Sequence, residues 1–135
     1  MLPAPRLSLA SLKTFLEGTM SSRSVIETYF KRLGAKTGWE PLLADDVAFT
    51  SFTSPNKQLA GKPVYLEATK RFYSTIQSFE LRGLIVDGAT ACALTRYQLK
   101  GPAGTFQSDV AEIFTVRDDK IATLAIYFDT APFPK

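Results

Sequence analysis

Histidine is absent from the 135 residues of this chain, and its absence removes several kinds of catalytic site. A Ser-His-Asp or Cys-His centre needs an imidazole to take the proton of the nucleophile, and most zinc sites use histidine or several cysteines. Cysteine occurs once, as Cys92, so an intrachain disulfide and a cysteine metal cluster are both excluded. Acid–base chemistry must therefore use carboxylates, tyrosines or lysines, and we expect neither a metal nor a cofactor.

Long apolar runs are also missing. No segment approaches the roughly 18 apolar residues of a membrane span, and the first residues, "MLPAPRLSLASLKTFLEG", carry prolines and charges where a signal peptide needs an apolar run. The net charge of +3 comes with basic residues in scattered pairs, not in a stripe, and we find no nucleic-acid motif. We expect a cytoplasmic protein that binds neither membrane nor nucleic acid.

The length corresponds to one domain, which we expect to span residues 22–135 after an N-terminal extension of residues 1–21 with the spacing of a short helix. A stronger helical pattern follows Ser24, which has capping-box spacing with Glu27. A second helix is predicted after Pro63, because proline is favoured at the first helical position. Between these helices "WEPLLADD" predicts a short helical piece, "VAFTSF" a strand and "TSPNKQLAGK" a polar loop.

Four strand candidates follow the second helix with short separators: "SFELRGLIVD", "ATACALTRYQLK", "TFQSDVAEIFTV" and "KIATLAIYF". Helices followed by consecutive antiparallel strands predict an α+β fold, with the helices packed on one face of a curved sheet. Both faces of the last two strands are low in charge, although a sheet with one wet face would alternate apolar and polar residues. We therefore expect the outer face to be covered in a homodimer.

Several passages in order and spacing resemble the nuclear transport factor 2-like superfamily, and within it the SnoaL-like branch. They are "VIETYFKRL", "LLADDVAFTSF", "LAGKPVYLEA" and "EIFTVRDDKIATLAIYFD". The branch is related to ketosteroid isomerases and limonene epoxide hydrolases. The resemblance implies a cone, in which a strongly bent antiparallel sheet wraps around the N-terminal helices and leaves a deep pocket at its open end. It also implies dimers through the outer sheet face.

The resemblance also implies that the isomerase's catalytic base is replaced. Its position corresponds to Ser51, and a serine without a nearby histidine is a poor base. The isomerase's tyrosine on the first helix falls nearest to Glu27, with Tyr29 two residues away. Glu112 corresponds to the isomerase's protonated oxyanion-hole aspartate, and to an acidic position in SnoaL-like cyclases that serves as acid or base.

The hydrolase's catalytic groups are mostly replaced as well. Its water-positioning tyrosine and asparagine fall on Phe49 and Ser51, and its arginine-x-aspartate becomes Arg96-Tyr97-Gln98. Its remaining aspartate falls on Ile126. Epoxide hydrolysis by that mechanism is therefore not expected.

The predicted pocket is mostly apolar with a few polar groups, which is the usual composition of a small-molecule site. Its catalytic candidates are Glu112 as general acid or base, with Arg96, Ser51 and Gln98. Its wall is expected to contain Tyr29, Phe49, Cys92, Leu94, Val110, Phe114, Leu124 and Ile126.

Three placements of Glu112 stay open: in the pocket, in a buried ion pair with Arg96, or facing solvent. An unpaired carboxyl among apolar side chains has a raised pKa and is a competent acid near neutral pH, whereas a close arginine keeps it ionised. Cys92 is expected to be a small buried hydrophobe, not a nucleophile, and Asp109 to face away from Glu112. The sequence predicts binding of a small, largely apolar organic molecule with cofactor-free proton transfer of the isomerase, cyclase or lyase type. The alternative is a non-catalytic ligand-binding or protein-interaction module.

Overall fold

The computed structural model describes residues 20–53 and 57–133. Helix α2 spans Ser22–Gly34 and buries five side chains at helical spacing along one face: Val25, Ile26, Tyr29, Phe30 and Leu33. Its N-cap is Ser21, whose hydroxyl accepts a hydrogen bond from the Ser24 amide at 3.1 Å. The capping box predicted from Ser24 is therefore wrong, because the helix begins about one turn earlier. The helix predicted within residues 1–21 lies outside the described residues, and the domain boundary there stays a prediction.

The second helix and all five predicted strands are present. The elements after α2 are η1 (Glu40–Leu42), β1 (Leu43–Ser51), β2 (Lys57–Ala60), α3 (Lys62–Thr75), β3 (Ile76–Asp87), β4 (Thr90–Gly101), β5 (Gly104–Arg117) and β6 (Lys120–Phe128). Pro63 lies in the first turn of α3 as predicted. Part of the predicted loop forms β2, a short strand that pairs with β1, and only the first half of "WEPLLADD" is helical because β1 already begins at Leu43.

The six strands form one sheet in the order β2-β1-β6-β5-β4-β3. Every neighbouring pair is antiparallel except β1 and β6, which run parallel. The predicted antiparallel sheet is thus a mixed sheet with one parallel pair, which joins the first and last strands of the described residues. The turn between β5 and β6 uses Asp118 and Asp119, both at positive φ, as the tightest hairpin turns require.

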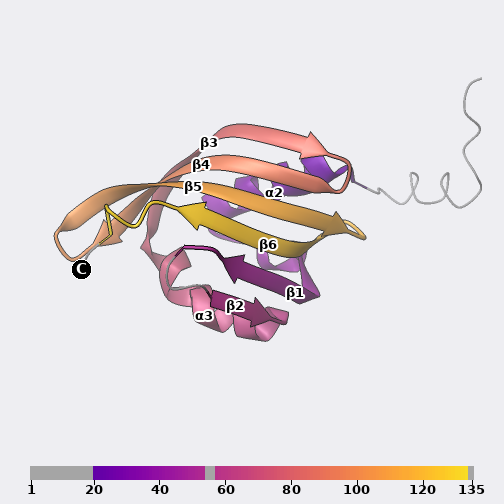
Figure 1. Cartoon of the computed structure of the whole chain (residues 1–135), viewed down its shortest axis with the longest axis horizontal. Coiled ribbons are helices and arrows are strands. Elements are labelled where there is room, and N and C mark those ends of the chain that lie inside the picture. Colours follow the sequence, from indigo (N-terminus) through magenta and orange to yellow (C-terminus); the bar gives the residue numbers. More distant parts are fainter. Residues whose placement is uncertain (1–19, 54–56, 134–135) are drawn as a thin grey trace, which may run out of the picture.

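The sheet bends over the helices (Figure 1). Helix α2 contacts β3, β4, β5 and β6, and α3 contacts β1, β2 and β4. The long strands curve across α2, while α3 lies beside β1 and β2 (Figure 1). The predicted α+β class with a strongly curved sheet around the helices is confirmed. No helix within residues 20–53 and 57–133 is long and apolar enough to cross a bilayer.

Candidate functional site

A cavity of about 300 Å³ lies between the inner face of the sheet and helix α3. Seven of the predicted site and wall residues line it: Tyr29, Phe49, Ser51, Val110, Glu112, Leu124 and Ile126. Phe114 does not line it; this residue is fully buried and packs edge-on against Tyr29 at 5.8 Å between ring centroids. The curved sheet therefore places most of the predicted wall where the sequence indicated.

Strand register fixes the relation between Ser51 and Glu112. Ile126 on β6 pairs with Ser51 on one side and with Glu112 on the other. Neighbouring strands lie 4.7–4.9 Å apart, so the backbones of Ser51 and Glu112 are about 10 Å apart across the concave face. A molecule lying over Ile126 would have the serine hydroxyl on one flank and the carboxyl on the other.

Glu112 is buried, with 5% of its surface exposed. Its Oε2 accepts a hydrogen bond from the Thr95 hydroxyl at 2.9 Å, and the Tyr97 hydroxyl lies 3.0–3.1 Å from both carboxyl oxygens. No basic side chain pairs with it in the part of the chain that the structure describes. Burial therefore dominates and raises the pKa of Glu112 to about 7, although the hydrogen bonds from Thr95 and Tyr97 act to lower it.

Three further tyrosines join the two helices beside the carboxyl. The Tyr73 hydroxyl lies 2.9 Å from that of Tyr29 and 2.6 Å from that of Tyr65, so the three hydroxyls form a chain with Tyr73 in the middle. Burial raises the pKa of all three well above 10, which keeps them protonated as hydrogen-bond donors. All three line the cavity.

Sequence reasoning identified Tyr29 but missed Tyr65, Tyr73 and Tyr97. The missed signal on α3 is spacing, because residues eight apart lie on the same side of a helix, and Tyr65 and Tyr73 have that separation.

Four predicted site residues lie on the wrong face of the sheet. On β4 the buried positions are odd-numbered, including Ala93, Thr95, Tyr97 and Leu99. Side chains alternate along a strand, so the even-numbered positions face outward. The corrected residues are Cys92, Leu94, Arg96 and Gln98.

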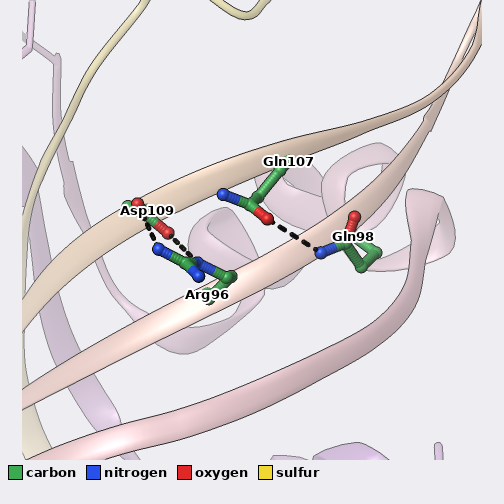
Figure 2. A network of polar contacts seen from close by, with 4 residues as sticks. All are labelled: Arg96, Gln98, Gln107 and Asp109. Atoms are coloured by element: carbon green, nitrogen blue, oxygen red, sulfur yellow. Dashed lines mark hydrogen bonds and ion pairs between the residues drawn. The ribbon is translucent and has the colours of Figure 1, made fainter.

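The outward residues have partners of their own. Arg96 forms an ion pair with Asp109 at 2.8 Å, and Gln98 donates to Gln107 at 3.3 Å (Figure 2). The hydrogen bond from Arg96 lowers the pKa of Asp109. The ion pair that the sequence left open between Arg96 and Glu112 is therefore absent, and Asp109 faces away from Glu112 as predicted.

The alternation of polar and apolar residues along β4 indicates in the sequence which side chains face outward. Arg96, Gln98 and Lys100 occupy even positions, whereas alanines, a tyrosine and a leucine occupy most odd ones. That pattern favours an outward face for the even positions. Matching "Arg96-Tyr97-Gln98" to the hydrolase's arginine-x-aspartate assigned the even-numbered residues to the inner face of β4, which is wrong. Cys92 is half-buried on the same outer face.

The arrangement defines a class of protein: a small α+β domain whose bent sheet encloses an apolar cavity with one buried carboxyl and a set of tyrosine hydroxyls. The SnoaL-like domain family matches residues 26–124, and the chain belongs to that family. The relationship predicted from the sequence is thereby confirmed.

Solved structures show the same fold. A candidate ketosteroid isomerase from Kribbella flavida is 20% identical with a TM-score of 0.67, over 84% of this chain and 82% of that one. A candidate SnoaL-like polyketide cyclase from Shewanella putrefaciens is 11% identical with a TM-score of 0.69, over 98% and 95%. A nuclear transport factor 2-like protein of unknown function from Cytophaga hutchinsonii is 13% identical with a TM-score of 0.69, over 86% and 96%. No curated protein matched the chain.

Proposed function

We propose that this protein binds a small, largely apolar organic molecule with a carbonyl group in the cavity and catalyses cofactor-free proton transfer on it. The observation that supports the proposal is Glu112, a buried cavity carboxyl with a pKa raised to about 7 and without a basic partner among the described residues. A group with a pKa near the working pH populates both protonation states, which is the condition for efficient general acid–base catalysis.

The proposed reaction removes a proton from the carbon next to the carbonyl and returns it. In its ionised form the Glu112 carboxylate accepts this proton, and the carbonyl oxygen gains the negative charge of an enolate. Two of the three hydroxyl protons of Tyr29, Tyr65 and Tyr73 are used between the hydroxyls themselves. The third is free to be donated to that oxygen, since the raised pKa values keep all three hydroxyls protonated. Return of the proton to a different carbon gives isomerisation. Attack of the enolate carbon on a second carbonyl of the same molecule gives cyclisation, and the oxygen of that carbonyl then takes the proton from Glu112.

A two-stage experiment tests this function. A thermal-shift screen with small cyclic ketones and lactones first identifies a compound that binds. Exchange of its α-hydrogens in D₂O is then followed by mass spectrometry, and we expect the protein to accelerate the exchange. Glu112→Gln should reduce the enzymatic exchange about a hundredfold or more, whereas Asp109→Asn, on the same strand but the opposite face, should leave it unchanged.

Two points favour a second candidate, a non-catalytic binding module. Both oxygens of Glu112 are already within hydrogen-bond distance of protein hydroxyls, and Ser51 stands where the related isomerase has its base. Ketones that bind in the cavity without faster hydrogen exchange would support this candidate and refute proton transfer.

The assembly belongs to the same proposal. We expect a homodimer through the outer sheet face, because Ile85, Leu94 and Tyr127 on that face are 64%, 44% and 47% exposed. Large apolar side chains gathered on one exposed face are typical of an interaction surface. The cytoplasmic location stays a prediction.

A further inference from the structure

The cavity contains a further buried polar group, Ser108, which the proposed proton transfer does not use. Ser108 lines the cavity and is 1% exposed. It is the one residue with a buried side-chain nitrogen or oxygen lacking a hydrogen-bond partner within residues 20–53 and 57–133. A buried hydroxyl without a partner is costly because it has lost its hydrogen bonds to water.

The surroundings explain why the protein itself offers Ser108 no partner. The neighbours on the same face of β5 are Phe106 and Val110, both apolar. Directly opposite on β4 is Tyr97, whose hydroxyl is engaged with Glu112. On the other side β6 has already ended at Phe128, which pairs with Val110.

We propose that Ser108 is the second hydrogen-bonding point of the cavity and determines specificity for a ligand with two oxygen functions. One oxygen lies beside Glu112 and the tyrosines, the other lies beside Ser108, and an apolar frame joins them. The inference rests on the proposed function, since it assumes that the cavity holds an organic ligand.

The geometry limits the separation of the two oxygens. Ser108 and Glu112 are four residues apart on one face, about 13 Å between Cα atoms in an extended strand. The carboxyl of Glu112 leans along the strand toward the position of Val110, because it accepts from the short side chain of Thr95, the residue opposite Val110, and this shortens the distance to Ser108. The ligand is therefore a short bifunctional molecule, such as a bicyclic diketone or hydroxyketone.

Two matched probes test the inference: trans-2-decalone, with one carbonyl, and trans-decalin-2,6-dione, with a carbonyl at each end. Calorimetry would give the affinity of the wild-type protein and of Ser108→Ala for both. We expect the ratio of dione to monoketone affinity to fall about threefold to tenfold in Ser108→Ala, which corresponds to one lost hydrogen bond. Ser78→Ala, an exposed serine on β3, is the matched control and should keep the wild-type ratio.

The ligand-free protein gives an independent readout. Because the Ser108 hydroxyl has no protein partner to lose, Ser108→Ala should melt no lower than the wild type. An unchanged affinity ratio, as expected if the hydroxyl only binds water, would overturn the inference while leaving the proposed function intact. So would a Ser108→Ala protein that melts several degrees lower, since the hydroxyl would then be structural. Binding of neither probe to the wild type would refute the ketone site itself, and the role of Ser108 with it.

Discussion

A single carboxyl dominates the chemistry of this protein because of where its strand places it. Glu112 gains two hydroxyl partners and loses nearly all contact with water, and desolvation of the charged form outweighs the hydrogen bonds. The desolvation that raises the pKa of Glu112 into the range useful for acid–base catalysis also makes the stability of the folded state depend on pH.

Stability should fall as pH rises through the range in which Glu112 titrates. Its pKa is raised from 4.5 to about 7, so between these values the unfolded chain releases a proton that the folded chain keeps. The stabilisation that the raised pKa of Glu112 gives the folded state is fully present below pH 4.5 and is lost by about pH 7. The unfolding free energy falls by up to roughly 3 kcal/mol across this range. Urea denaturation at a series of pH values should show this slope in the wild type and a flatter curve in Glu112→Gln. Parallel curves for the two proteins would contradict the raised pKa.

Removal of the Tyr97 hydroxyl should raise the pKa of Glu112 further. This hydroxyl stabilises the ionised carboxylate, and its hydrogen bond acts to lower the pKa. In Tyr97→Phe we expect a value above that of the wild type, measured by NMR titration of ¹³C-labelled glutamate. Tyr127→Phe on the exposed outer face is the control and should not change it. A lower value in Tyr97→Phe would show that the hydroxyl stabilises the protonated form instead.

At the scale of elements, the tyrosine chain connects α2 to α3. Tyr73→Phe should lower the unfolding free energy by about 1–3 kcal/mol, because the hydroxyls of Tyr29 and Tyr65 both lose their shared partner. Chemical denaturation would measure the loss, with Tyr127→Phe again as the control. Equal stability of the two variants would mean that Tyr29 and Tyr65 find other partners.

The strands differ in how well their inner and outer residues could be predicted from the sequence. On β5 and β6, period two and the resemblance together indicated Val110, Glu112, Leu124 and Ile126, which line the cavity, but also Phe114, which does not, and they missed Ser108 and Phe128. On β4 the inner and outer faces were exchanged, because the match to the hydrolase's motif was given more weight than the alternation of the polar residues Arg96 and Gln98 with apolar ones. The tyrosine contacts could not be predicted, since they depend on how α2 and α3 pack.

At the scale of the whole molecule, the outer sheet face should decide the assembly. Light scattering of the wild type should give the mass of a dimer, and Leu94→Asp should give a monomer, because it places a charge among the exposed apolar residues of that face. Val64→Asp, at an exposed position on α3 instead of the outer sheet face, should stay dimeric. A monomeric wild type at concentrations of tens of micromolar would refute the interface.

The parallel pairing of β1 with β6 has a consequence for the folding pathway. Thr53 and Phe128, which are hydrogen-bonded at the end of this pair, lie 75 positions apart in the chain. Closing so long a loop costs entropy before the contacts repay it, and folds rich in such distant contacts fold slowly. Because Ser51 and Glu112 belong to strands on either side of this closure, β3 to β6 could pair without forming the cavity. Ligand binding therefore reports completion of the fold, whereas the hairpins alone do not.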